Sequence, residues 1–267
     1  MRKLGFILYF FILSQSSIAS SPPPNNAVAL SLGGASTTYL NALSIENNVG
    51  ALAYSKNEIS LNGSNSFGLT EYSRVMLAGN IKTKYASIGF AYQVNPVASL
   101  TVQKAQFAIA KQLGEKLSAG VALNYHQFSS TDAYYKSSNS ITFNAGLYYR
   151  VNDKLNTGFS VFNPNQSKLT NNPAENLNSS LRLGLDYALV DNIKLYCDAI
   201  QNSGQKLDLN AGLELKKDDY KIRGGFGLNH LLALGFGWDK NKFGIDVAAA
   251  YHNQLGFSPS LNIRYAF

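Results

Sequence analysis

The chain has 267 residues, a formal net charge of +7 and only 15% charged residues, whereas a soluble domain typically has about 25%. Its mean hydropathy is −0.10, and after the first few residues there is no apolar run long enough for a membrane helix. Scattered basic residues exclude a nucleic-acid-binding surface, and one cysteine excludes a disulfide framework. Low charge without long apolar runs favours a membrane β-barrel.

Residues 1–19 are predicted to be a secretory signal peptide. Arg2 and Lys3 precede the apolar run 4–13, and Ser17 and Ala19 then have the spacing that signal peptidase prefers. The run is shorter than the roughly 20 residues that a membrane helix needs. The alternative is a retained N-terminal anchor helix.

Residues 20–57 are predicted to form a separate N-terminal segment. Apolar and small residues are mixed here without the alternation of a strand, and the segment is too apolar for a free periplasmic tail. We expect it to occupy the barrel interior as a hatch; the alternative is a partly ordered extension packed under the barrel. The candidate hatch residues are Gly33, Gly34, Ala35, Asn48 and Gly50.

Residues 58–267 are predicted to form an all-β, transmembrane, antiparallel barrel of about fourteen strands, because short segments with period-two alternation recur between turn signals. Most have the roughly 9–11 residues that a tilted membrane strand needs. The expected strands are 59–67, 75–82, 85–94, 105–113, 116–126, 141–151, 155–163, 180–189, 193–201, 206–216, 220–228, 231–239, 243–252 and 259–267.

The connections between these strands alternate between two kinds. Tight charged turns at 82–84, 114–116, 152–154, 190–192, 217–219 and 239–241 alternate with looser polar loops such as 129–140 and 164–179. Outer-membrane barrels have short periplasmic turns and longer external loops. The pattern therefore places both chain ends in the periplasm and requires an even strand number. A soluble β-sandwich, the alternative, requires no such asymmetry.

Alternation also assigns the two faces of the wall. Leucine and aromatic residues fall on the lipid face, where an Arg or Lys near the midplane would cost about 2–4 kcal/mol. We expect the mixed-sign inner charges to form structural ion pairs between barrel and hatch, for example by Arg182 and Asp186, rather than a selectivity ring. The candidate polar residues of the lumen are Asn124, Asn144, Arg182, Asp186, Asp208, Glu214, Arg223, Asp246 and Arg264.

Glycines are concentrated on the predicted inner face. Eleven fall there by parity, among them Gly146, Gly212, Gly225, Gly237 and Gly244, and only Gly63, Gly79 and Gly224 clearly fall outward. An inner wall without side chains leaves room for another part of the chain or lets the wall bend. We expect the N-terminal segment to use this room.

The chain ends on an alternating segment whose last residue is aromatic. This ending resembles the C-terminal signal by which bacterial outer-membrane barrels are recognised for insertion, and it implies the barrel-assembly machinery as a partner. The residues that carry the signal are Leu261, Ile263, Tyr265 and Phe267.

Residues 30–54 resemble the N-terminal region of fatty-acid-transporter-like (FadL-type) barrels and of the related PorV/PorQ barrels of type IX secretion. Those families place a Gly-Gly-Ala element before an Asn-Pro-Ala-Gly-like element, here Gly33-Gly34-Ala35 and Asn48-Val49-Gly50-Ala51, with Val49 in place of the proline. The resemblance implies a fourteen-stranded barrel with an N-terminal hatch.

No enzymatic motif is present. HExxH, GxSxG and Cys/His patterns are missing, and His126, His230 and His252 are expected at external strand ends as solvated residues rather than as a metal or hydrolase site. We expect no cofactor, no metal and no nucleic acid. Two functions remain for a multi-pass protein of a Gram-negative outer membrane: a PorV/PorQ-like component of protein secretion or surface display, or FadL-like passive transport of hydrophobic molecules. Expected partners are outer-membrane lipid and either secretion-apparatus proteins or a hydrophobic ligand.

Overall fold

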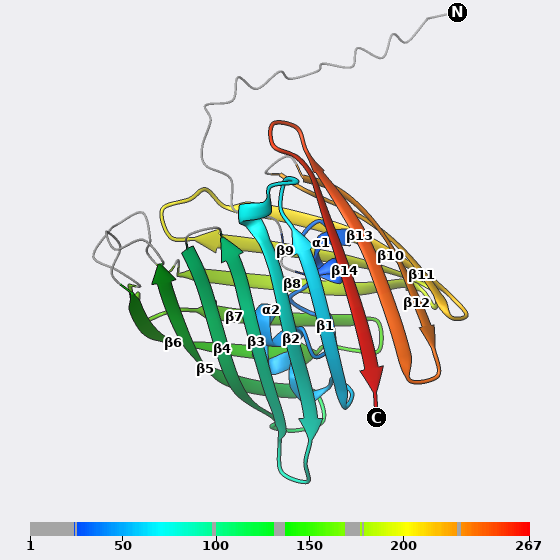
Figure 1. The fold of residues 1–267 in the computed structure, drawn as a ribbon. Coiled ribbons are helices and arrows are strands. Elements are labelled where there is room, and N and C mark those ends of the chain that lie inside the picture. Colours follow the sequence, from blue (N-terminus) through cyan, green and yellow to red (C-terminus); the bar gives the residue numbers. More distant parts are fainter. Residues whose placement is uncertain are drawn as a thin grey trace, which may run out of the picture.

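A computed structural model describes residues 24, 26–97, 100–130, 137–168, 177, 179–228 and 231–267. Within these residues, fourteen antiparallel strands form a closed barrel in which β1 pairs with β14 (Figure 1). The strands are β1 (Glu58–Asn65), β2 (Ser73–Lys82), β3 (Ser87–Val97), β4 (Leu100–Gln112), β5 (Leu117–Ser130), β6 (Ser138–Arg150), β7 (Leu155–Phe162), β8 (Ser180–Val190), β9 (Ile193–Asn202), β10 (Asp208–Lys217), β11 (Tyr220–Gly227), β12 (Leu231–Lys240), β13 (Phe243–His252) and β14 (Gly256–Ala266).

The predicted barrel and its strand number are confirmed, and closure rules out the β-sandwich. The largest difference in bounds is at β4 and β5, which extend several residues further than predicted, to Leu100 and Ser130. In these extensions Gln103 pairs with Gln127. Alternation of apolar and polar residues fails there because a strand that extends beyond the hydrocarbon does not need an apolar outer face. The predicted signal peptide lies outside the described residues.

The barrel has two different ends. At one, which we call the turn end, the described residues form tight turns, and Ala266 lies opposite Glu58 at the start of β1. Figure 1 shows the C-terminus at the same end as the β2–β3 turn. The other end, the loop end, carries the longer connections, including the loop with the short helix η2 (Thr70–Tyr72). By the rule for outer-membrane barrels, the turn end is periplasmic.

Alternation along each strand divides the wall into an apolar outer face and a packed inner face. In β13, Phe243, Ile245 and Val247 are exposed, whereas Asp246 and Ala248 are buried. Closure leaves no free sheet edge, so the backbone groups of the wall can be paired within the membrane. The inner face is buried because another part of the chain covers it.

Residues 26–55, which we call the luminal segment, lie inside the barrel between its front and rear strands (Figure 1). The segment contains α1 (Ala27–Ser31), α2 (Ser44–Asn47) and the 3₁₀ helix η1 (Val49–Ala53). The Asn26 side chain caps α1 by accepting a hydrogen bond from the Ala29 N–H at 2.8 Å, and Gly33 and Gly34 follow with φ of +65° and +101°. No helix of the described chain has the length and apolar character needed to cross a membrane.

Candidate functional site

The luminal segment follows the inner wall, and inward glycines let the two backbones meet. A Cβ at Gly225 of β11 would lie 2.6 Å from the Leu32 carbonyl oxygen, and one at Gly212 of β10 would lie 2.7 Å from the same atom. On the other side of the barrel, a Cβ at Gly120 would lie 2.7 Å from the Val49 carbonyl oxygen. Real Cβ atoms do not approach so closely, so any side chain at these wall positions would displace the segment.

Asn48 fastens the segment to β6. Its side-chain N–H groups donate to the carbonyl oxygens of Thr37 at 3.1 Å and Leu147 at 2.8 Å, and its side-chain oxygen accepts from the Gly50 N–H at 3.0 Å. A Cβ at Gly146 would lie 2.9 Å from the Gly50 nitrogen. The Asn48 side chain therefore joins two parts of the segment to the wall, and there is room for it because the wall residue beneath it is Gly146.

Asp198 of β9 holds the middle of the segment from the opposite wall. One of its carboxylate oxygens accepts from the Ser36 N–H at 2.8 Å, the Thr37 N–H at 2.9 Å and the Thr37 hydroxyl at 2.7 Å. All three residues are buried. A buried carboxylate needs such donors to offset its desolvation, so this contact fixes the segment where it passes β8 and β9.

Arg223 of β11 is the centre of a buried charged network near the turn end. Its side chain is fully buried and contacts Glu214 at 2.6 Å and Asp246 at 2.8 Å. Its third contact is with the luminal segment, because Nη2 donates to the Tyr39 hydroxyl at 3.0 Å, and that hydroxyl donates to Glu214 at 3.2 Å. Burial raises the pKa of the Tyr39 phenol, so the hydroxyl stays protonated and can donate.

The network continues to the closing strands of the barrel. Arg264 of β14 contacts Asp246 at 2.8 Å and Asp239 at 2.6 Å, and Lys221 contacts the other oxygen of Asp239 at 2.7 Å. Glu58, at the start of β1, accepts from the Ala42 N–H at 3.2 Å. The network thus joins β1, β10 to β14 and the segment into one charged cluster.

Glycine also makes room for these ion pairs. Arg223 lies on β11 and reaches Asp246 on β13 across Gly237 of β12, where a Cβ would lie 2.8 Å from the Asp246 carboxylate and 3.1 Å from the guanidinium. A Cβ at Gly244 would lie 2.8 Å from Arg264 in the same way. The room left by Gly237 and Gly244 is therefore taken by charged side chains rather than by the segment.

The other half of the segment is held by apolar packing and one ion pair. Ile45, Val49 and Leu52 are fully buried in a cluster with small inward residues of β2 to β5. At the same place Glu46 forms an ion pair with Lys104 of β4 at 2.6 Å. Small wall residues and large segment residues interdigitate here, as in the core of a soluble domain.

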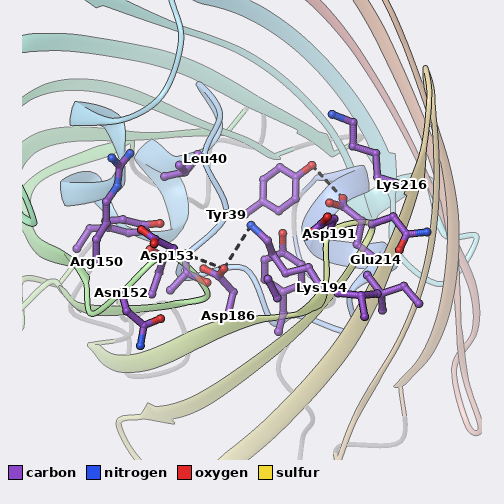
Figure 2. Close-up of a pocket in the computed structure, with 18 of the residues that line it drawn as sticks. Tyr39, Leu40, Arg150, Asn152, Asp153, Asp186, Asp191, Lys194, Glu214 and Lys216 are labelled. Atoms are coloured by element: carbon purple, nitrogen blue, oxygen red, sulfur yellow. Dashed lines mark hydrogen bonds and ion pairs between the residues drawn. The ribbon is translucent and has the colours of Figure 1, made fainter.

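A cavity of about 850 Å³, which we call the vestibule, opens beneath the segment at the turn end. Figure 2 shows Tyr39 and Leu40 of the segment above Asp186, Lys194 and Glu214 of the wall. Leu40 is 36% exposed although it belongs to an otherwise buried segment. The vestibule also carries turn residues of both charges, among them Lys116, Arg150, Asp153, Asp191 and Lys216.

The structure places the predicted lumen residues on the inner wall. Glu214, Arg223, Asp246 and Arg264 come together in the charged network, whereas Asp186 lies in the vestibule. Buried side-chain amides continue the inner wall towards the loop end, where Asn124 accepts from Gln106 and donates to Thr142, and Asn144 accepts from the Asn163 N–H. Asp208 lies at the start of β10, where it accepts from Asn210 at 3.4 Å.

Arg182 and Asp186 do not pair as expected. Asp186 instead contacts Lys194 at 3.4 Å and accepts from Asn156 at 3.0 Å, and the Arg182 guanidinium lies 5.2 Å from the Phe162 ring centre. The two residues are four positions apart on β8, which separates them along the strand by roughly 13 Å. Ion pairs in this wall therefore join different strands, either neighbouring ones, as for Asp186 and Lys194, or strands two apart, as for Arg223 and Asp246.

The predicted hatch residues lie where the segment bends or meets the wall. Gly33 and Gly34 have positive φ, Ala35 is buried beside Leu32, and Asn48 and Gly50 contact β6. Leu261, Ile263, Tyr265 and Phe267 of the C-terminal signal are exposed on the outer face, and the Phe267 N–H donates to the Asn57 carbonyl at 3.1 Å. Their roles as hatch and as insertion signal stay predictions.

The two described histidines, His126 and His252, do not come together. His126 lies within hydrogen-bonding distance of the Thr142 hydroxyl at 3.1 Å, and His252 accepts from the N–H groups of Gln254 and Leu255 in a turn. His230 lies outside the described residues. Among the residues that are described, no group of three or more His, Cys, Asp and Glu side chains could hold a metal ion.

Sequence reasoning assigned no contact to Tyr39, Glu46, Glu58 or Asp198. These residues act through partners far away in the sequence, and the segment has no periodicity from which an orientation could be read. Glu46 and Tyr39 are polar residues within an apolar stretch, which is the one signal that could have marked them.

Comparisons with known proteins give a family and a fold. The family model described as type IX secretion system membrane protein PorP/SprF matches residues 77–266. The solved structure of the CymD monoaromatic hydrocarbon channel has a TM-score of 0.71 at 13% identity and covers 91% of this chain and 97% of its own. The solved structure of the Pseudomonas putida toluene transporter TodX has a TM-score of 0.67 at 11% identity and covers 91% of this chain and 96% of its own. That of a Pseudomonas aeruginosa FadL homologue has a TM-score of 0.62 at 12% identity and covers 92% of this chain and 99% of its own.

At these identities the solved structures show the fold alone. The expected relation to FadL-like outer-membrane barrels and to type IX secretion is confirmed, and the matching type IX family is PorP/SprF. No curated protein matches the sequence. The match begins within β2 and ends at the last residue of β14, so it covers the barrel wall except β1 and the start of β2, and it does not cover the luminal segment.

Proposed function

The chain belongs to the PorP/SprF family of type IX secretion system membrane proteins, and from this premise we propose that it is a non-enzymatic outer-membrane component of the secretion apparatus. In this proposal residues 58–267 form the membrane barrel and residues 20–57 form a hatch that keeps it closed. The barrel is then an anchor for other components, and the secreted protein does not pass through it.

The observation that carries this proposal is the packing of the luminal segment. Its aliphatic residues other than Leu40 are almost fully buried, and its backbone contacts the wall at Gly120, Gly212 and Gly225. A pore would need a water-filled path beside these contacts. Close-packed backbone contacts on both sides of the barrel support a closed body instead.

A closed anchor needs a surface that its partners can reach, and the vestibule supplies one. Leu40 is an exposed apolar side chain among vestibule residues of both charges. Protein interfaces commonly have such an apolar centre with a polar rim. We assign contact with periplasmic secretion components to this surface.

Site-specific photo-cross-linking in cells tests this assignment. A photoreactive amino acid in place of Leu40 should form adducts with other secretion components, whereas the same group in place of Val247, which is 49% exposed on the outer wall, should not. A lack of protein adducts from Leu40, in cells where the variant reaches the outer membrane at normal levels, would contradict the assignment.

Passive transport of a hydrophobic small molecule is the second candidate. This candidate is favoured by the fold that the chain shares with the CymD and TodX channels, because nearly the full length of each channel aligns with this chain. Uptake of a monoaromatic hydrocarbon by proteoliposomes separates the two functions. Uptake at the rate of empty liposomes supports the closed anchor, and a clearly faster rate supports transport.

A further inference from the structure

The outer wall of the barrel has a hollow of about 520 Å³ where β7 to β11 run side by side. It lies on the opposite side of the wall from the luminal segment, on the face that meets the membrane. Nothing in the secretion or transport functions above uses it. Its volume is within the range of about 300–1,000 Å³ typical of ligand sites.

Strand register produces this hollow. On the outer face Cys197 of β9 pairs with Leu185 of β8 and Ala211 of β10, and Ala199 pairs with Leu183 and Leu209. Small side chains on β9 and β10 thus form a floor. Ala211 in turn pairs with Phe226 of β11, so large side chains form a rim on both sides of that floor.

The rim projects and the floor does not. Leu183 is 59% exposed and Phe226 is 54% exposed, whereas Cys197 between them is half-buried. The β8 and β11 rims are three strand spacings apart, roughly 14 Å. A groove of this width, narrowed further by the rim side chains, accommodates an extended hydrocarbon chain.

The hollow offers almost no hydrogen-bonding groups. Asp198 and Asn210 contribute to its floor, but the Asp198 carboxylate turns inward to Ser36 and Thr37 and the Asn210 amide contacts Asp208. The outward side chains are apolar apart from that of Thr157. An apolar hollow that faces a bilayer is filled by hydrocarbon, because water there would lose its hydrogen bonds.

The position of the hollow indicates which lipid supplies that hydrocarbon. Leu183 and Leu209 lie near the loop-end termini of β8 and β10, and Phe226 lies near that of β11. The loop end is external in outer-membrane barrels. We propose that this hollow is a binding site for one acyl chain of an outer-leaflet lipid, which stays with the protein when bulk lipid is removed.

The hollow is continuous with the exposed apolar surface on either side, which includes Leu181 and Leu232. Lipid is therefore the occupant already in contact with its rim. A transmembrane part of another protein would have to displace that lipid first, and it is distinguished from lipid by the experiment below.

Native mass spectrometry of the full-length protein in a mild detergent tests the proposal. Ala211→Leu fills the floor, Ala211→Gly keeps it open, and Ala249→Leu makes the same enlargement at an exposed outward position of β13 outside the hollow. The wild type, Ala211→Gly and Ala249→Leu should retain a lipid adduct, and Ala211→Leu should lose it several-fold. The released adduct should be identified by its fatty-acid content.

Equal retention of the lipid adduct by all four proteins, or its equal loss from all four, would show that the hollow holds no specific lipid and would overturn the proposal. A polypeptide adduct in place of lipid would overturn it too. If Ala211→Leu does not fold, as judged by circular dichroism, Ala199→Leu provides the same test from the neighbouring row of the floor, with the same expected loss.

Discussion

Gly225 of the barrel wall lies directly against Leu32 of the luminal segment, so that a Cβ at Gly225 would be 2.6 Å from the Leu32 carbonyl oxygen. The contact is between two backbones, and neither can relax by rotating a side chain. Similar backbone contacts with the segment occur at Gly120 of β5 and Gly146 of β6 on one side and at Gly212 of β10 on the other.

Gly225→Ala should therefore weaken the docking of the segment. Overpacking of this kind costs about 1–3 kcal/mol, and limited proteolysis in detergent should cut the segment faster than in the wild type. Gly63→Ala is the matched control, because a Cβ at Gly63 has no atom within 4 Å. Equal proteolysis rates for the two variants would contradict the close contact.

Asp198→Ala should release the segment at a different point. It removes the carboxylate oxygen that accepts three hydrogen bonds from Ser36 and Thr37, and a buried donor left unpaired costs about 1–3 kcal/mol. We expect a lower midpoint of thermal unfolding and faster proteolysis between α1 and α2. Asp191→Ala, in the exposed β8–β9 turn, should leave both unchanged. An unchanged midpoint for Asp198→Ala would show that the carboxylate does not hold the segment.

Tyr39→Phe should remove the hydrogen bonds with Arg223 and Glu214, at a cost of about 1–3 kcal/mol. Because burial raises the Tyr39 pKa, the unfolded chain releases this proton first as the pH rises past about 10. The stability from Tyr39 is thus complete below that pH and is lost above it. Wild-type unfolding measured from pH 8 to 11 should therefore show a steeper alkaline decline than Tyr39→Phe.

Tyr85→Phe is the control for that series, since Tyr85 is 75% exposed in the β2–β3 turn. It should reproduce the stability and the alkaline slope of the wild type. If Tyr39→Phe also has the stability and the alkaline slope of the wild type, the Tyr39 phenol makes no net contribution to the stability of the protein.

Arg223→Met should be the most damaging single change in the charged network. It leaves Glu214 and Asp246 buried without their common partner, and breaking a buried pair in this way costs about 3–5 kcal/mol. Denaturant unfolding in detergent measures the loss. Lys240→Met removes an exposed cation at the end of β12 and should have little effect. A similar loss in both variants would indicate an effect of net charge rather than of the buried pairs.

The sequence predicts the wall of this protein much better than its interior. Period-two alternation places Arg223, Glu214 and Asp246 on the inner face, because a charge facing lipid is too costly. The same parity brings Gly225 inward and indicates that something fills the room it leaves. What fills it depends on the position: the luminal segment at Gly225, and the Arg223–Asp246 ion pair at Gly237.

The contacts made by the luminal segment cannot be predicted from the alternation of residues along the strands. Tyr39 meets Arg223 across 184 positions of sequence, and no local pattern determines such a distant pairing. The short helices α1, α2 and η1 have too few residues for a periodic apolar face. Their orientation is set by the shape of the wall, so it emerges only once the barrel is closed.

Single-channel conductance in planar bilayers tests most directly whether residues 26–55 close this barrel. The full-length protein should show no steady open current, and a variant lacking residues 26–53, with its strand content checked by circular dichroism, should show one. A full-length protein that conducts as well as the deletion variant would contradict the account.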